Sequence, residues 1–286
     1  MQIDSVILDI DGVLVDVSES YRRAIADTIE SLSGEEFPPD GIQLLKNAGG
    51  FNNDWELTDA GILCTIAIRH GYPGDLLSLI HEIGENGGGL AVTKNLISEA
   101  IGSDAEDEWD PHTVRAMFQS LYLGKDKFLE CFQQHPIIDV PGYHLSEEII
   151  IAPYTIEKLL NQFNVGILTG RPLFEVDMVL NNMSIEIPSN HIMAMENSPS
   201  KKPSPEGLLS LAKTFDSSSI VFVGDTIDDI KTVANAKKVD PSKNYHSIGV
   251  LTGGLSGKSG TKLFKENGAD IVIPDINHLP EVLLDF

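Results

Sequence analysis

The stretch VILDIDG, residues 6–12, decides how this chain can fold, because a short apolar run ends abruptly in acidic residues. Its first three residues are apolar and partly β-branched, which predicts a strand buried on both faces. Asp9 and Asp11 follow that strand at once, and Gly12 favours a turn. The stretch therefore predicts a buried strand whose carboxyl end carries two acidic side chains.

Two later stretches repeat this pattern of an apolar run followed by a polar, glycine-containing turn. Residues 164–168 (NVGIL) stop at Thr169-Gly170-Arg171, and residues 220–223 (IVFV) stop at Gly224-Asp225. Stretches with helical periodicity lie between them, for example residues 154–163. Strands that alternate with helices indicate a parallel α/β sheet, and such sheets bind ligands beyond the carboxyl ends of their strands. We therefore expect the three polar turns to meet in one site.

Residues 17–149 have a different character, since they carry amphipathic helical patterns and no convincing strand. The clearest patterns cover residues 19–32, 62–70, 76–83 and 114–132. This block interrupts the α/β pattern after the first strand. We therefore expect a discontinuous core of residues 1–16 and 150–286, with a second, all-helical domain inserted between its two segments.

Composition and charge limit the classes of partner. The 286-residue chain is 42% hydrophobic and 22% charged, as is typical of folded globular proteins. Its formal net charge of -23 and its lack of a basic run argue against nucleic acid as a partner. A phosphorylated substrate would need local compensation by a cation, a lysine or backbone amides.

The cysteines and the apolar runs bear on location. Cys64 and Cys131 are far apart and form no metal-binding pair, which fits a reducing compartment. Acidic residues interrupt the apolar residues near the amino terminus, and no window is long enough to span a membrane. We expect a cytoplasmic protein with no membrane partner.

The run Asp9-Ile10-Asp11-Gly12-Val13 after its strand resembles the first motif of the haloacid dehalogenase superfamily. Thr169 ends a strand as in the second motif, Lys202 in KPSPEGL resembles the third, and residues 224–229 (GDTIDD) resemble the fourth. The four motifs occur in the family's order, within the two segments expected to form the core. The resemblance implies a Rossmann-like core with an inserted helical cap of the C1 type, as in phosphoglycolate phosphatases and β-phosphoglucomutases.

The resemblance also implies an activity, that of a magnesium-dependent phosphatase that hydrolyses a small phosphorylated metabolite through an aspartyl-phosphate. Asp9 would be the nucleophile, and Asp11 would protonate the leaving oxygen and later deprotonate the attacking water. Relatives that cleave carbon–halogen bonds lack the second aspartate, so Asp11 favours phosphate. Thr169 with the amide of Gly170 would bind phosphoryl oxygens, and Lys202 would pair with Asp9 and the phosphate.

The same resemblance implies the ligands of Mg²⁺. Asp9 and Asp225 would supply carboxylates and Asp11 its carbonyl, while Asp229 would help directly or through water. Asp228 occupies a neighbouring position and is the alternative to Asp229.

The sequence leaves alternative interpretations open for several single residues. Thr169 could instead cap a helix, and Lys201 competes with Lys202 for the role of the lysine. Pro203 favours Lys202, since the family's lysine directly precedes that proline. Arg171 is expected to contact the substrate, although a salt bridge explains it equally well.

The insert contains one stretch with the groups to recognise a polar substrate. Two glycines precede Asn52, Asn53 and Asp54, which offer amides and a carboxylate. We expect these three residues to bind substrate; the alternative is a turn that caps the following helix. The insert is longer than the family's usual helical cap, so the substrate cannot be carried over from relatives.

Two other functions are compatible with the four motifs. A phosphomutase would return the phosphoryl group to a sugar, and would convert isomers without releasing free phosphate. A non-catalytic binding protein would retain the fold without turnover, although intact motifs argue against it.

Overall fold

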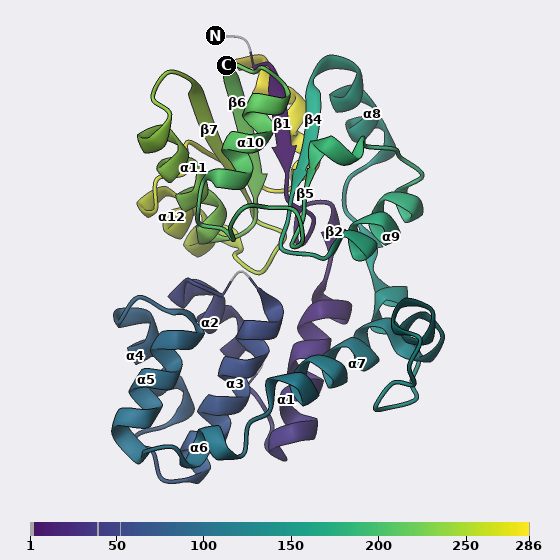
Figure 1. The fold of residues 1–286 in the computed structure, drawn as a ribbon. Helices are drawn as coiled ribbons and strands as arrows, with labels where there is room; N and C mark the ends of the chain where they lie inside the picture. The colour runs from purple at the N-terminus through teal and green to yellow at the C-terminus, as the bar shows by residue number, and fades with distance from the viewer. Residues whose placement is uncertain (1–2, 39, 52, 286) are drawn as a thin grey trace. The chain divides into compact units, whose positions relative to one another are not determined.

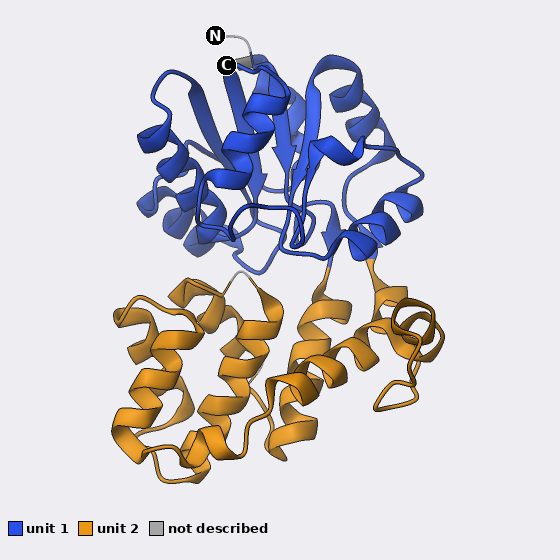
Figure 2. Ribbon diagram, viewed as in Figure 1, with its two compact units in different colours: residues 1–16, 148–286 blue, residues 17–147 orange. Residues whose placement is uncertain are grey.

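The computed structural model describes residues 3–38, 40–51 and 53–285. The chain divides into two compact units, one from Met1–Asp16 with Glu148–Phe286 and the other from Val17–Glu147 (Figure 2). The sequence predicts the second boundary two residues further along the chain. Unit 1 is therefore discontinuous, and unit 2 is inserted into it as a single segment.

Unit 1 is built on a six-stranded sheet in the order β5-β4-β1-β6-β7-β8 (Figure 1). Every neighbouring pair in this sheet is parallel, which confirms the predicted α/β fold. The strands are β1 (Ser5–Leu8), β4 (Asn164–Leu168), β5 (Ile192–Met193), β6 (Ser219–Gly224), β7 (Asn244–Val250) and β8 (Ile271–Ile273).

Helices alternate with these strands, as a parallel sheet requires. They are α8 (Pro153–Gln162), α9 (Leu173–Met183), α10 (Glu206–Thr214), α11 (Ile227–Val239), α12 (Gly257–Glu266) and α13 (Leu279–Val282), with 3₁₀ turns η3 (Ser189–His191), η4 (Ile276–His278) and η5 (Leu283–Asp285). A short antiparallel pair, β2 (Val15–Asp16) with β3 (Glu148–Ile149), stands where the chain leaves unit 1 and returns to it.

The core of unit 1 explains why its central strands are continuous apolar runs. Ile7 of β1 and Phe222 of β6 are buried with side chains of α10 and α11, including Leu208, Leu211 and Val233. A strand covered on both faces cannot alternate apolar with polar residues. Polar side chains are therefore displaced to the strand ends, which is where the site lies.

The elements of unit 2 are helices and helical turns joined by loops in its described residues. Its elements are the π-helical turn η1 (Ser18–Arg22), α1 (Arg23–Ser33), α2 (Gly41–Ala48), α3 (Asp54–Arg69), α4 (Leu76–Glu85), α5 (Gly89–Ile101), α6 (Asp104–Asp107), α7 (Pro111–Phe132) and the 3₁₀ turn η2 (Tyr143–Ser146). Helix α3 packs against α1, α5 and α7. Its residues from Leu57 to Ala67 are buried, so α3 is the centre of this unit. Within the described part of the chain, no helix has the length and apolarity needed to cross a membrane.

Candidate active site

Three polar turns meet at one edge of the sheet because their strands are neighbours. β1 lies between β4 and β6, and Leu8 is opposite both Ile167 and Val223. Parallel strands in this register present their carboxyl ends together. Asp9, Thr169 and Asp225 follow these three strands, and the side chains of all three are buried.

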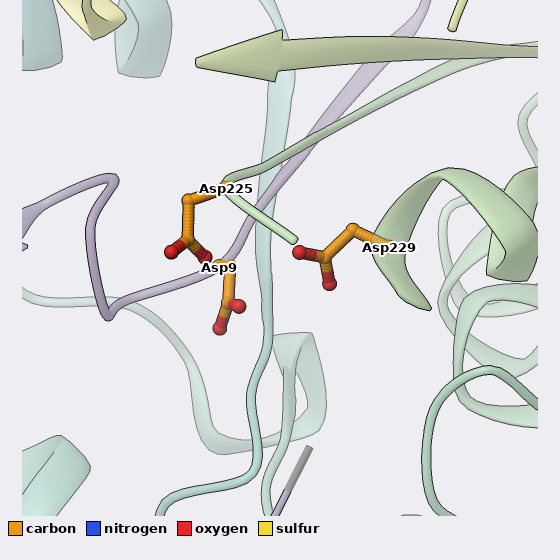
Figure 3. Close-up of side chains that lie close together, drawn as sticks. All are labelled: Asp9, Asp225 and Asp229. Carbon is orange, nitrogen blue, oxygen red and sulfur yellow. The ribbon is translucent and has the colours of Figure 1, made fainter. Parts of the chain in front are cut away.

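Three carboxylates form the centre of the site. Asp9, Asp225 and Asp229 each offer an oxygen atom, and these atoms lie within 4.8 Å of one another (Figure 3). The exposed fraction is 4% for Asp9, 5% for Asp225 and 1% for Asp229. Asp229 reaches the cluster from the first turn of α11. Of the two candidate acids on that helix, Asp229 is therefore the one that the described structure places in the cluster.

Lys202 joins two of these carboxylates. Its Nζ donates to Asp9 Oδ2 and to Asp229 Oδ1, at 2.6 Å each. Burial by itself would lower the pKa of Lys202, but the charges of Asp229 and Asp9 outweigh burial and raise it. Lys201 is exposed whereas Lys202 is buried, so Lys202 is the lysine that the fold brings to the site.

Asp9 is held in one orientation, but its charge is poorly compensated. Its Oδ1 accepts from the amide of Ile10 at 2.8 Å, while its Oδ2 receives Lys202. Burial raises the pKa of Asp9 to about 6; Lys202 opposes this rise, and the charges of Asp229 and Asp11 add to it. The single ammonium group of Lys202 therefore faces more carboxylates than it can neutralise, at a buried position.

This donor set fits a hard divalent cation. Carboxylate oxygens are the ligands that Mg²⁺ prefers, and a buried excess of negative charge is stabilised by a cation. The second oxygen of Asp229 is also bound. Asp229 Oδ2 accepts from the amide of Thr226 at 2.9 Å and from the Thr226 hydroxyl at 2.7 Å. These contacts belong to the capping box that begins α11. Backbone and side-chain contacts within unit 1 thus hold Asp9 and Asp229 of the cluster in place.

Thr169 lies where the second motif predicts it and does not cap α9. The helix begins after Pro172, and the Thr169 hydroxyl instead accepts from the amide of Arg171 at 3.2 Å. Its side chain is buried, and the neighbouring Gly170 is partly exposed. The helix-capping alternative for Thr169 is therefore not what the structure shows.

Arg171 points its guanidinium group at Asp11. Its Nε lies 2.8 Å and its Nη2 lies 2.7 Å from Asp11 Oδ1. The side chain of Arg171 is 1% exposed and that of Asp11 is 19% exposed. A salt bridge thus accounts for Arg171, and a contact of Arg171 with substrate stays a prediction.

Comparison with known families bears directly on this arrangement. Residues 3–237 match the family model described as haloacid dehalogenase-like hydrolase. The chain belongs to this family. The chain is also 26% identical over 295 aligned positions to an imidazoleglycerol-phosphate dehydratase of Phytophthora nicotianae. That alignment covers 98% of this chain but 52% of the relative, so the chain spans about half the length of the relative.

Solved structures share the fold of this chain at low sequence identity. Phosphatase Tt82 from Thermococcus thioreducens has a TM-score of 0.67 and 22% identity, with 98% of this chain and 99% of that chain covered. A hydrolase from Pseudomonas syringae has a TM-score of 0.56 and 18% identity, with 98% and 99% covered. A predicted phosphoglycolate phosphatase from Haemophilus somnus has a TM-score of 0.56 and 15% identity, with 99% and 98% covered.

The candidate site includes a fourth turn that the motifs do not identify. Thr252 and Gly253 follow β7, and the Thr252 hydroxyl donates to the carbonyl of Gly12. A Cβ atom on Gly253 would lie 1.7 Å from Asp225 Oδ2, and one on Gly12, whose φ is +68°, would lie 2.5 Å from Gly253 Cα. Only glycine fits such contacts. Residues 248–251 (IGVL) are an apolar run followed by TGG, which repeats the pattern of the other three turns, and this signal could have revealed the fourth turn.

Two of the three predicted substrate residues of the insert, Asn53 and Asp54, have partners within unit 2. Asn53 Oδ1 accepts from the amides of Trp55 at 2.9 Å and Glu56 at 3.3 Å, so Asn53 caps α3. Asp54 Oδ1 lies 3.1 Å from Lys46 Nζ. Asn52 lies outside the described residues. Substrate recognition by these three residues stays a prediction.

Proposed function

We propose that this hydrolase is a magnesium-dependent phosphatase that acts on a small phosphorylated metabolite through an aspartyl-phosphate on Asp9. The observation that carries the proposal is the buried cluster of Asp9, Asp225 and Asp229 bound to Lys202, with Asp11 two residues beyond the nucleophile. A carboxylate can attack a phosphate ester only when cations and donors neutralise both groups. The described site offers such donors at the edge of the sheet.

Each residue has a role in the proposed reaction. Asp9 attacks phosphorus, and the leaving oxygen departs as Asp11 gives it a proton. Asp11 then removes a proton from water, which attacks the aspartyl-phosphate and restores Asp9. Thr169, Gly170 and Lys202 stabilise the phosphoryl oxygens, whose charge is spread over the transition state.

Mg²⁺ would be held by the carboxylates of Asp9 and Asp225 and the carbonyl of Asp11, with Asp229 contributing directly or through water. When bound, it would neutralise negative charge on the phosphoryl group and the nucleophile. Thr226 and Gly253 support this set, since Thr226 holds Asp229 and Gly253 leaves room for Asp225.

The identity of the substrate is the part of the proposal that the helical insert decides. We propose that Asn52, Asn53 and Asp54 of the insert contact the substrate, while a contact of Arg171 with the substrate stays a prediction beside its salt bridge to Asp11. A screen of phosphate esters should include esters that carry an imidazole ring, because the Phytophthora nicotianae relative is named for imidazoleglycerol phosphate. The best ester in that screen defines the true substrate for later tests.

Hydrolysis of p-nitrophenyl phosphate by the purified protein tests the proposal. We expect turnover that needs added Mg²⁺, stops with EDTA, and falls at least roughly 1000-fold in Asp9→Asn, because the nucleophile is lost. Asp177→Asn is the matched control, since Asp177 is exposed on α9. Wild-type turnover no faster than that of Asp9→Asn would contradict the proposal.

Product analysis separates a phosphatase from a phosphomutase. Each sugar phosphate that reacts should yield free phosphate in the same amount as dephosphorylated sugar. Conversion between isomers without free phosphate would instead assign the site to a mutase.

A further inference from the structure

Two nitrogen atoms of Arg171 are bound to one oxygen of Asp11. Nε and Nη2 lie 2.8 Å and 2.7 Å from Oδ1. The two residues stand on the turns after β4 and β1, which are neighbouring strands. The guanidinium group is therefore buried between the nucleophile's turn and the turn that bears Thr169.

The backbone of Arg171 is anchored on both sides. Its amide donates to the Thr169 hydroxyl at 3.2 Å, and its carbonyl accepts from the amide of Met195 at 3.0 Å. A planar guanidinium group that donates twice from an anchored backbone restricts the orientation of a carboxylate far more than a single ammonium group can. Asp11 is thus held by a rigid donor pair.

This geometry makes the two oxygens of Asp11 different. Oδ1 receives two N–H groups, and a guanidinium group has no acceptor to which a proton on Oδ1 could be donated. A proton that Asp11 passes to a leaving group must therefore lie on Oδ2. On the basis of the proposed function, we propose that Arg171 is a positioning residue for this reaction: it holds Asp11 so that Oδ2 carries the transferred proton to the leaving oxygen.

Leaving-group dependence distinguishes this role from a general contribution to folding. p-Nitrophenolate departs without a proton, whereas the alkoxide of glycerol phosphate needs one. We expect Arg171→Met to lower kcat/KM for glycerol phosphate by roughly 10- to 100-fold more than for p-nitrophenyl phosphate, because misplacing a reacting group costs about this much. The ratio of the two values does not depend on the fraction of enzyme that is folded.

Four further variants complete the experiment. Arg171→Lys restores one donor and should show an intermediate ratio, and it carries the test if Arg171→Met does not fold. In an Asp11→Asn background, Arg171→Met should cause little additional loss with glycerol phosphate, because both changes remove the same function. Arg23→Met, which removes a half-exposed arginine of unit 2, should leave the ratio unchanged.

The outcomes separate this inference from the proposed function. An active wild-type enzyme whose substrate ratio is unchanged in both Arg171 variants would overturn the positioning role alone. A wild-type protein that hydrolyses neither ester would overturn the proposed function and this inference together.

Discussion

Lys202 and Asp59 illustrate two ways in which a buried charge is compensated in this protein. Lys202 shares its charge between Asp9 and Asp229, and this compensation raises its pKa. Asp59, on α3, instead accepts a hydrogen bond from the uncharged Trp109 Nε1 at 2.8 Å. Burial raises the pKa of Asp59 to about 6, the bond from Trp109 opposes the rise, and the charges of Glu56 and Asp110 add to it.

The raised pKa of Asp59 predicts a pH-dependent stability of unit 2. The folded state holds the proton of Asp59 more tightly than the unfolded chain, whose carboxyl titrates near 3.8. This group therefore lowers the free energy of unfolding as pH rises from about 4 to about 6, by up to about 3 kcal/mol. Asp59→Asn keeps an acceptor for Trp109 and should raise the melting temperature more at pH 8 than at pH 4.5, measured by calorimetry.

Asp126→Asn on α7 provides the control, because Asp126 is exposed. An equal shift of the melting temperature by Asp59→Asn at both pH values would contradict the argument from burial.

At the scale of elements, helix starts supply the site with fixed groups. The capping box of Thr226 and Asp229 begins α11 and at the same time directs Asp229 toward Lys202. Asn53 begins α3 in a similar way, with its side chain bonded to the amides of the first turn. A residue that caps a helix can thus also place a polar group for ligand binding.

Asn53 can be tested for these two functions separately. We expect Asn53→Ala to lower the free energy of unfolding by about 1 kcal/mol, because α3 loses its cap, whereas Asn53→Ser keeps a capping oxygen. If Asn53 also recognises substrate, both variants should lower kcat/KM for the true substrate, by roughly 10-fold or more. Chemical denaturation and steady-state kinetics give the two quantities.

Asn86→Ser, at the exposed end of α4, is the matched control. A normal kcat/KM in Asn53→Ser would show that Asn53 serves the helix and not the substrate.

At the scale of the whole molecule, the net charge of -23 places a cation site within a strongly acidic chain. Any salt screens the repulsion among surface charges, so a rise in stability with Mg²⁺ is not by itself evidence of a site. The buried cluster differs from the surface because its carboxylates are little exposed to solvent and lie within 4.8 Å of one another. Binding of Mg²⁺ at the cluster can therefore be separated from general charge screening by comparison with a salt of equal ionic strength.

Magnesium should stabilise the folded protein by binding at the carboxylate cluster of unit 1, beyond its effect as a salt. At a concentration 100 times its dissociation constant, a ligand of the folded state adds about 2.7 kcal/mol to the free energy of unfolding. We expect Mg²⁺ to raise the melting temperature more than NaCl of equal ionic strength, and Asp225→Asn to abolish that difference. Equal effects of the two salts on the wild-type protein would contradict the metal site.

The amino-acid sequence by itself determined the parallel core, the helical nature of the insert and the position of Asp9 at a strand end. These features depend on local patterns, since an apolar run and the polar turn after it lie within about ten residues. Gly253 was missed although its signal was also local, because its turn belongs to none of the four motifs.

The tertiary structure decided which groups meet. It selected Lys202 over Lys201 and placed Asp229 in the carboxylate cluster, because burial and carboxylate neighbours depend on segments far apart in the chain. It also joined Arg171 to Asp11, residues separated by 160 positions. The sequence around either residue does not predict its contact with the other, because the pairing of β1 with β4 brings their turns together.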